Sequence, residues 1–333
     1  MLKSILFTHT DLDGAGCRII FELVNINNKK GEDYIVTHCQ NNTVDDDVMN
    51  CLETYKDIIN DDTIICFSDI VAHDETLMYL KDRFKNINIW DHHITNYPAQ
   101  LVIPSATIVD ENEMGIRQAG TSLIYQYYVE QSLLNPIEIF DKKYNQSLIS
   151  EFVDTVRSYD TYEWKETNNM KAKELVTLFF LLGMEAFCKR YVEKLSNMNM
   201  DEELISSSDM DFVRAKLDNE QANIDRITPD DVFHINLDGY KTAFLLGGRG
   251  ANVSELSYQF LQKYPEFDVF AAFLLNENNK VSFRSIRDDV NVSELAAKLH
   301  GGGHKLASGT TLPNDVVKDI AFTIFDYMNN LIG

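Results

Sequence analysis

Short apolar runs alternate with helical repeats along the N-terminal part of the chain. The runs typical of buried strands are residues 3–8, 34–39, 63–69 and 87–93. Between them, apolar residues recur at spacings of three and four over 16–24 and 75–84, as expected of helices. A chain that alternates strands and helices in this way favours a parallel sheet with helices on both faces. We therefore predict an N-terminal α/β domain built on a doubly wound parallel sheet.

Helical spacing dominates the next part of the chain. The segments with apolar residues three and four apart are 121–134, 147–160 and 172–184. We expect these helices to cover the sheet. From Met210 to Ile227 a thin apolar stripe runs along an otherwise polar helix, which ends at a Thr-Pro-Asp-Asp sequence. This helix is predicted to connect two domains.

A second, smaller pattern follows the connector. The predicted strands are 232–237, 241–247, 267–275 and 280–286. Helices are predicted to start at Asn252 and Asn291, because the sequence NVSEL occurs at both places with a capping Asn and a Glu three residues later. A last helix is expected over 315–328. These elements predict a C-terminal α/β domain with a mixed sheet.

Length and composition agree with two globular domains. The chain has 333 residues, of which 44% are hydrophobic and 25% charged. The predicted organisation is a first domain at 1–200, a helical linker at 201–231 and a second domain at 232–333. With 52 acidic and 30 basic side chains the formal net charge is -22. Such a chain repels long polyanions, which argues against a grip on long duplex nucleic acid.

The sequence gives no sign of a membrane or an oxidising compartment. The N-terminal MLKSILF has one Lys and a short apolar run, so it is interpreted as a strand and not as a signal peptide. The longest apolar stretch, at 175–184, is too short to span a bilayer. The 5 cysteines lack CxxC spacing, which favours reduced core thiols and not a disulfide or zinc framework. A cytoplasmic protein is predicted.

Acids and imidazoles follow three of the predicted strands. They are His9, Asp11, Asp13, Asp69, Asp91, His92 and His93. The carboxyl ends of parallel strands line a common crevice, where such folds bind their ligands. Asp and Gly also form ordinary turns, and Asp69 before a helix has the simpler interpretation of a cap. Three acid-bearing strand ends at one edge of a sheet nevertheless favour a metal site. Carboxylates mixed with imidazoles suit Mn, and a pair of metals requires a carboxylate that bridges them.

These motifs together resemble a known family. HTDLDG at 9–14, FSD at 67–69, DHH at 91–93, SFRS at 282–285 and GGGHKLASG at 301–309 occur in the order and spacing of the DHH phosphoesterase superfamily with its associated C-terminal domain. The resemblance spans nearly the whole chain. Each motif is weak alone, whereas the set in this order is specific.

The resemblance implies two divalent cations, most simply Mn, with Mg or Co as alternatives. His9 and Asp11 would hold the first cation, Asp13 and His92 the second, and Asp69 would bridge both. Between them the cations would generate a bridging hydroxide that attacks phosphorus in line. The absence of a GxxxxGK[ST] motif is consistent with this interpretation, since no phosphate loop is needed.

The family also uses a further aspartate after the helical region. Asp160 is preferred over Asp154, because it lies where a helix gives way to a loop. Asp91 is expected to orient an imidazole, which is the usual need of ligating histidines. The resemblance implies that His93 faces the substrate phosphate, so that Asp69, His93 and Asp91 form the predicted catalytic group.

The second domain is expected to bind the substrate. Three glycines in a row exceed what a helix stop requires, and backbone without side chains lets amide groups approach a phosphate closely. Arg284 and His304 would clamp that phosphate. The predicted substrate-binding residues are His93, Arg284, Ser285, Gly301, Gly302, Gly303 and His304. For GGRGAN at 247–252 a phosphate contact and a plain turn both stay open.

The resemblance is to the oligoribonuclease branch of the family. It implies a Mn-dependent phosphodiesterase that hydrolyses oligonucleotides of two to five nucleotides to 5′-mononucleotides. Hydrolysis of cyclic dinucleotides or of 3′-phosphoadenosine 5′-phosphate is the alternative. A non-catalytic nucleotide-binding scaffold is disfavoured, because it should have lost metal ligands that this sequence retains. The aromatic segment 123–130 suits a core or a homodimer equally.

Overall fold

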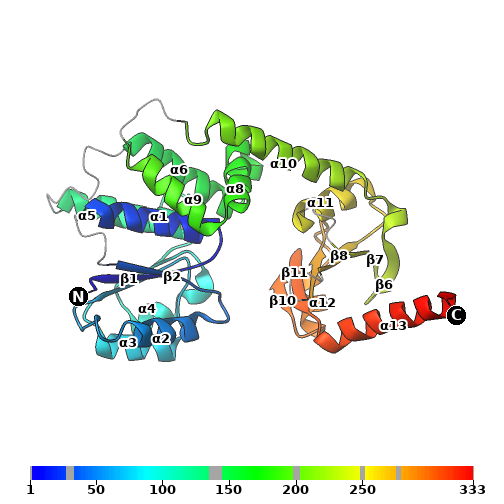
Figure 1. The fold of residues 1–333 in the computed structure, drawn as a ribbon, viewed down its shortest axis with the longest axis horizontal. Coiled ribbons are helices and arrows are strands. Elements are labelled where there is room, and N and C mark those ends of the chain that lie inside the picture. The colour runs from blue at the N-terminus through cyan, green and yellow to red at the C-terminus, as the bar shows by residue number, and fades with distance from the viewer. Residues whose placement is uncertain are drawn as a thin grey trace. The chain divides into compact units, whose positions relative to one another are not determined.

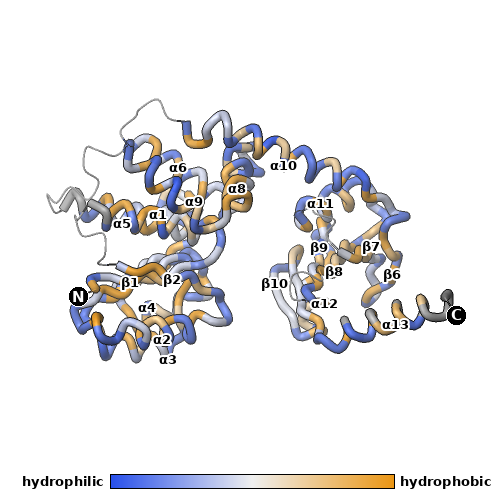
Figure 2. The backbone as a smooth tube through the Cα atoms, viewed as in Figure 1, coloured by the Kyte–Doolittle hydropathy of each residue, from blue (hydrophilic) through white to orange (hydrophobic). Residues whose placement is uncertain are grey.

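The computed structural model describes residues 2–27, 34–134, 145–197, 203–247, 252–274 and 279–332. The chain divides into two compact units, Met1–Arg214 and Ala215–Gly333. The division falls within helix α10 (Ser207–Asp225), and thus inside the stretch that the sequence analysis assigns to a linker. In Figure 2 this helix is mostly hydrophilic, whereas hydrophobic residues concentrate in strands such as β1 and β8.

The first unit is built on a five-stranded, all-parallel sheet with the order β2-β1-β3-β4-β5. Its strands are β1 (Ser4–Thr8), β2 (Tyr34–His38), β3 (Ile64–Ser68), β4 (Ile87–Asp91) and β5 (Thr107–Ile108). In the register, Thr8 lies opposite Ser68 and Ser68 lies opposite Trp90. The carboxyl ends of β1, β3 and β4 are therefore level with one another, and the predicted parallel sheet is confirmed.

Helices cover both faces of this sheet (Figure 1). One layer contains α1 (Leu12–Asn27), α5 (Gly120–Leu134), α6 (Gln146–Asp160), α8 (Met170–Leu182) and α9 (Met184–Leu195). The opposite layer contains α2 (Val44–Thr54), α3 (Asp74–Arg83) and α4 (Ala99–Val102). Short helical turns complete the unit at η1 (Ile94–Asn96) and α7 (Glu163–Glu166). The predicted doubly wound arrangement is confirmed.

Helix α2 is absent from the sequence prediction. Its buried residues are Val44, Val48, Cys51 and Leu52, which have helical spacing. Three consecutive acids, Asp45 to Asp47, occupy its first turn and interrupt the apolar pattern, although they suit the positive end of a helix dipole. Because its apolar stripe is short, this helix can be recognised in the sequence only once the strands on each side of it are known.

Both faces of the central strands are buried. All five residues of β1 are buried, as expected of a strand covered by helices on two sides. Phe7 and Phe67 stack on neighbouring strands with ring centroids 5.2 Å apart, in the core beneath α2 and α3. On the opposite face, Trp90 contacts Tyr127 and Tyr128 of α5 at centroid distances of 4.8 and 6.0 Å. These tyrosines of segment 123–130 therefore pack within the unit itself.

The second unit has a six-stranded mixed sheet with the order β10-β11-β9-β8-β7-β6. The strands are β6 (Phe233–Leu237), β7 (Tyr240–Leu246), β8 (Val269–Leu274), β9 (Lys280–Arg284), β10 (Gly302–His304) and β11 (Ala307–Thr311). Only the pair β7 and β8 is parallel among these described strands. The predicted mixed sheet is confirmed.

Helices accompany this second sheet. They are η2 (Pro229–Asp231), α11 (Val253–Lys263), α12 (Val292–Lys298) and α13 (Asn314–Ile332). Asn252 and Asn291 cap α11 and α12, since each side-chain oxygen accepts a hydrogen bond from the amide two residues later. Strands β10 and β11 were not predicted, because glycine-rich segments have low strand propensity and their pairing depends on the neighbouring β9.

Candidate metal centre

The loops after β1, β3 and β4 bring their polar residues to one edge of the parallel sheet. The sequence DLDG at 11–14 forms the start of α1 and not a free turn, because Asp11 Oδ1 accepts a hydrogen bond of 3.0 Å from the amide of Gly14. Asp11 thus caps the helix. Its second oxygen, Oδ2, faces His9, and Asp13 follows within the first helical turn.

His9 and Asp11 form a close pair at this edge. The His9 Nδ1 to Asp11 Oδ2 distance is 2.8 Å, and the same nitrogen is 4.0 Å from Asp69 Oδ2. The hydrogen bond to Asp11 raises the pKa of His9 against the opposing effect of its burial. Burial would raise the pKa of Asp11, but the hydrogen bond and charge of His9 bring the net shift below the usual value.

Asp69 lies at the centre of the cluster and is only 3% exposed. Its amide donates to the carbonyl of Trp90 at 3.0 Å, which fixes the backbone to β4. Its Oδ1 is 3.4 Å from His92 Nε2 and 4.0 Å from His93 Nδ1. Its Oδ2 is buried without a hydrogen-bond partner among the described residues. Burying a carboxylate oxygen without a hydrogen-bond partner costs free energy. A bound cation would offset this cost if Asp69 Oδ2 were one of its ligands.

His92 faces three carboxylates. Its Nε2 is 3.3 Å from Asp160 Oδ2, 3.4 Å from Asp69 Oδ1 and 3.9 Å from Asp13 Oδ2. In the described part of the chain, this buried nitrogen also has no hydrogen-bond partner. Burial lowers the pKa of His92, which favours the neutral imidazole that binds metals.

The structure separates the two candidate aspartates on α6. Asp160 ends the helix and lies beside His92. Asp154 points elsewhere: its side chain is 65% exposed and accepts a hydrogen bond of 2.8 Å from Arg157 Nη2. The geometry therefore brings Asp160 into the cluster and leaves Asp154 on the surface.

Sequence reasoning missed the residues that hold Asp13. Its Oδ2 accepts from the amide of Gly120 at 2.6 Å and its Oδ1 from the amide of Thr121 at 2.9 Å. Both donors lie at the start of α5, where amide groups have no partner within the helix. A Cβ on Gly120 would lie 2.7 Å from Asp69 Cβ. The run of small residues at 119–122 was the available signal, although small residues at a helix start are common.

Asp91 fixes His93. The completely buried Asp91 accepts from His93 Nδ1 at 2.8 Å and from the amide of His92 at 2.8 Å. The hydrogen bond to Asp91 raises the pKa of His93 despite partial burial. The imidazole that Asp91 orients is thus that of His93, whose ring is half exposed and lines a neighbouring pocket.

The chemistry of the donor set fits two divalent cations. Groups of possible ligands within 4.8 Å of one another are His9, Asp11 and Asp69; Asp13, His92 and Asp160; and Asp69, Asp91, His92 and His93. Burial and the neighbouring charges of Asp13 and Asp11 raise the pKa of Asp69 and of Asp160 well above the usual range. Such crowding of acids leaves negative charge that cations would neutralise. Asp69 belongs to the group with His9 and Asp11 and also to a group with His92, so it lies between the two sets as a bridging ligand would.

The second unit has a pocket of about 630 Å³ around Arg284 and residues 301–303. The guanidinium of Arg284 donates to Ser254 Oγ and to the carbonyls of Phe283 and Ser308, which hold it at the pocket wall. Two of the substrate-binding residues predicted in the second unit, Ser285 and His304, do not line this pocket. His304 is exposed on β10, and the hydroxyl of Ser285 donates to the carbonyl of Asp268.

The three glycines of GGGH have different surroundings. A Cβ on Gly301 would lie 2.2 Å from the carbonyl oxygen of Gly309, and one on Gly303 would lie 2.6 Å from Ser308 Cα. A Cβ on Gly302 would meet nothing within 4 Å. Close approach of β10 and β11 therefore explains two of the glycines. For the segment 247–252, residues 248–251 lie outside the described part of the chain.

Comparisons with known proteins agree with this fold. A DHHA1 domain profile matches residues 240–330. The structure of a pGpG-specific phosphodiesterase, PggH from Vibrio cholerae, is similar with a TM-score of 0.52 and 15% identity over 98% of this chain and 99% of that one. RecJ from Thermus thermophilus, solved with Mn²⁺, is similar with a TM-score of 0.56 and 13% identity over 98% of this chain and 52% of RecJ. The profile match lies within the second unit, and the predicted resemblance to the DHH phosphoesterase superfamily with its associated C-terminal domain is confirmed.

A curated relative is more similar in sequence. Oligoribonuclease NrnB from Bacillus subtilis strain 168 is 28% identical over 325 residues, which cover 93% of this chain and 73% of NrnB. The predicted resemblance to the oligoribonuclease branch is confirmed. Among the described residues, moreover, no helix has the length and apolar character needed to cross a membrane.

Proposed function

We propose that this protein is a divalent-metal phosphodiesterase that hydrolyses oligonucleotides of two to five nucleotides to 5′-mononucleotides in the cytoplasm. The observation that carries the proposal is the pair of buried, unpartnered atoms Asp69 Oδ2 and His92 Nε2 among the carboxylates at three strand ends. The 28% identity to an oligoribonuclease over most of the chain supports the substrate class.

The proposed cation ligands are those that the geometry groups. His9 and Asp11 would hold one cation, and Asp13, His92 and Asp160 the other. Asp69 would serve both, because its Oδ1 is 3.4 Å from His92 Nε2 and it is grouped with His9 and Asp11. Mn is the expected ion because the set mixes imidazoles with carboxylates, and Mg or Co would also suit it. Bound cations of this kind polarise a phosphoryl oxygen and lower the pKa of water.

The other residues of the site would hold a cation ligand in place and orient the imidazole that faces the phosphate. The amides of Gly120 and Thr121 fix the carboxylate of Asp13. Asp91 fixes the ring of His93 through Nδ1 and raises its pKa, which favours the imidazolium, and in that form Nε2 can donate to a phosphoryl oxygen as negative charge develops there. Electrostatic stabilisation of this kind strengthens in a water-poor site.

The second unit would provide a second phosphate contact. Arg284 is held at the wall of the pocket in this unit, and Gly302, which also lines that pocket, has open space around its backbone. A short substrate needs only such local contacts, whereas the net charge of -22 opposes a long polyanion. The predicted preference for short substrates follows from this contrast.

The test is hydrolysis of labelled RNA of two to five nucleotides and of 30 nucleotides in the presence of Mn, with products identified by mass spectrometry. We expect 5′-mononucleotides from the short strands and at least tenfold slower turnover of the long strand. Equal or faster cleavage of the long strand would contradict the proposal. Cyclic dinucleotides and 3′-phosphoadenosine 5′-phosphate are included, because a preference for either would assign the protein to the alternative function.

A further inference from the structure

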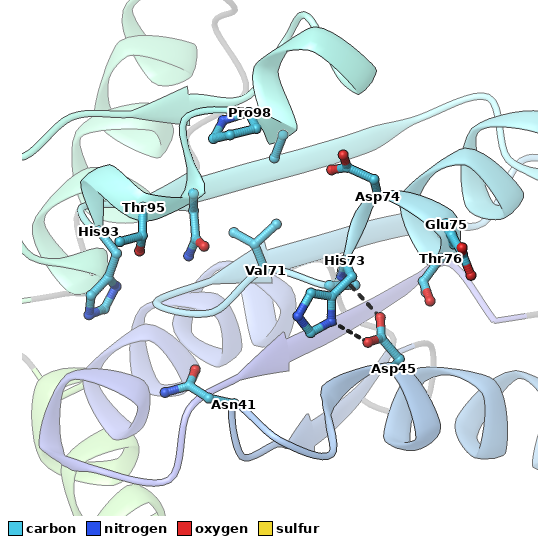
Figure 3. Close-up of a pocket in the computed structure, with 13 residues that line it drawn as sticks. Asn41, Asp45, Val71, His73, Asp74, Glu75, Thr76, His93, Thr95 and Pro98 are labelled. Carbon is cyan, nitrogen blue, oxygen red and sulfur yellow. Dashed lines mark hydrogen bonds and ion pairs between the residues drawn. The ribbon is translucent and has the colours of Figure 1, made fainter. Parts of the chain in front are cut away.

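A pocket of about 830 Å³ lies beside the metal centre and shares His93 with it. The loops after β2, β3 and β4 form its walls, and all of them belong to the first unit (Figure 3). Its size suits a purine nucleoside with room for water. Because His93 is on its wall, a group in this pocket would be adjacent to a phosphate held at the cluster.

The lining combines apolar surface with a planar ring. Val71, Ala72, Pro98 and Ala99 provide apolar surface, and Figure 3 shows Val71 between His93 and His73. Nucleobases bind to apolar and aromatic surface through their faces and to polar groups through their edges. The pocket offers both kinds of contact.

His73 is held as a rigid wall of the pocket. Its amide donates to Asp45 Oδ1 at 3.0 Å, and its Nδ1 is hydrogen-bonded to Asp45 Oδ2. This pair ties the start of α2 to the loop before α3. The imidazole remains 75% exposed, so its face is accessible to a ligand although its orientation is fixed.

The rim near α3 is acidic. Asp74 and Glu75 line the pocket, are exposed, and have no ion-pair partner among the residues that the structure describes. Their charge repels a phosphate, so the neutral part of a nucleotide is the part that enters. A carboxylate has two acceptor oxygens, and guanine is the base whose N1–H and N2–H₂ donors lie side by side on one edge.

We propose that this pocket binds the base of one of the two nucleosides that flank the scissile phosphate, and that it prefers guanine. The base lies against His73 and Val71, and its donor edge faces Asp74 or Glu75. The inference rests on the proposed function, since it names the substrate feature that the same site recognises.

The kinetic test compares the four dinucleotides pGpG, pGpC, pCpG and pCpC. A guanine at one position should lower KM about tenfold relative to cytosine, as expected for one bidentate contact. The same change at the other position should have little effect. H73A should raise KM for the preferred dinucleotide to the level of pCpC. The double variant D74N/E75Q should have the same effect. D82N, an exposed acid on α3 outside the pocket, is the matched control and should behave as wild type.

A binding test keeps the inference separate from the proposed function. GMP and CMP are titrated by calorimetry into the metal-free protein and the same variants. We expect tighter binding of GMP by wild type and D82N, loss of that difference in the double variant D74N/E75Q, and weaker binding of both nucleotides by H73A. Equal binding of GMP and CMP by wild type would overturn the inference even where dinucleotides are hydrolysed. If no dinucleotide is hydrolysed, the proposed function fails and the calorimetric comparison still decides whether the pocket prefers guanine.

Discussion

The backbone of Asp69 adopts the left-handed region, with φ of 60°. Residues other than glycine reach this region at a cost of about 1 kcal/mol or more. The hydrogen bond from the backbone amide of Asp69 to the carbonyl of Trp90 keeps the backbone in place, and the strand register keeps Ser68 level with Trp90. The conformation directs the carboxylate towards His9 and His92, so local strain coincides with the centre of the cluster.

Substitution of Asp69 tests whether this single residue serves both cations. Asp69→Asn preserves shape but removes a charge from both cation groups, so we expect turnover to fall about a hundredfold or more. The melting temperature of the metal-free variant should equal or exceed that of wild type, because repulsion with Asp13 is reduced. Asp154→Asn is the control and should retain full activity, since Asp154 contacts Arg157 at the surface. Activity of Asp69→Asn within threefold of wild type would contradict the assignment.

At the scale of elements, the start of α5 docks against the start of α1. Gly120 and Thr121 donate backbone hydrogen bonds to Asp13, and Thr121 Oγ1 donates to the carbonyl of Asp13. A Cβ on Gly16 of α1 would lie 2.2 Å from Thr121 Oγ1, so the two helices are in close contact there. The position of a ligand thus depends on how two helices pack.

Gly120→Ala tests this dependence. Alanine normally favours a helix, but here its Cβ would collide with Asp69 Cβ at 2.7 Å and Asp69 N at 2.9 Å. We expect at least tenfold weaker Mn binding by calorimetry with a cooperative thermal transition retained. Glu130→Ala, at an exposed position about three turns along α5, is the control and should bind Mn as wild type does. Unchanged Mn affinity in Gly120→Ala would show that Asp13 does not need this contact.

The glycines of β10 provide a matched pair in the second unit. Gly303 has φ of 137° and a Cβ there would lie 2.6 Å from Ser308 Cα, so Gly303→Ala should destabilise the unit by about 1–3 kcal/mol. Gly302 has open space around it, and Gly302→Ala should change the free energy of unfolding by less than about 0.5 kcal/mol. Urea denaturation measures both. Similar losses in the two variants would argue against the described pairing of β10 with β11.

At the scale of the whole molecule, the stability of the first unit should depend on cations and pH. Burial and neighbouring acids raise the pKa of Asp69 and Asp160 in the folded protein. The folded state therefore binds protons more readily than the unfolded chain. Without metal, the contribution of these two groups to the free energy of unfolding should fall as the pH rises above their pKa in the unfolded chain. A divalent cation should reverse this trend by neutralising the carboxylates.

Thermal unfolding with EDTA or with Mn measures this dependence. At a hundredfold excess over its Kd, a ligand of the folded state adds about 2.7 kcal/mol, which corresponds to roughly 5–10 °C for a unit of this size. The increase should be larger at pH 8 than at pH 5. No increase with Mn, Mg or Co would contradict the proposed metal centre.

The sequence by itself determined the alternation of strands and helices and the acids at the strand ends. Both follow from local patterns: apolar spacing identifies β1, β3 and β4, and His9, Asp69 and Asp91 come directly after them or close them. A parallel sheet then brings these ends together, because its strands run in one direction. The mixed sheet of the second unit could also be predicted, because local apolar patterns identify its strands β6 to β9.

Only the tertiary structure decided the contacts made across the chain. Asp13 and Gly120 are 107 residues apart, and no local pattern predicts that one will accept a hydrogen bond from the other. Asp160 and Asp154 lie on one helix, so the choice between them depends on which side of α6 meets the sheet edge. Strand β10, which GGGH forms, likewise depends on its pairing with β11 and on that of β11 with β9. Propensity and periodicity report short-range preferences, whereas these contacts depend on how separate elements pack against one another.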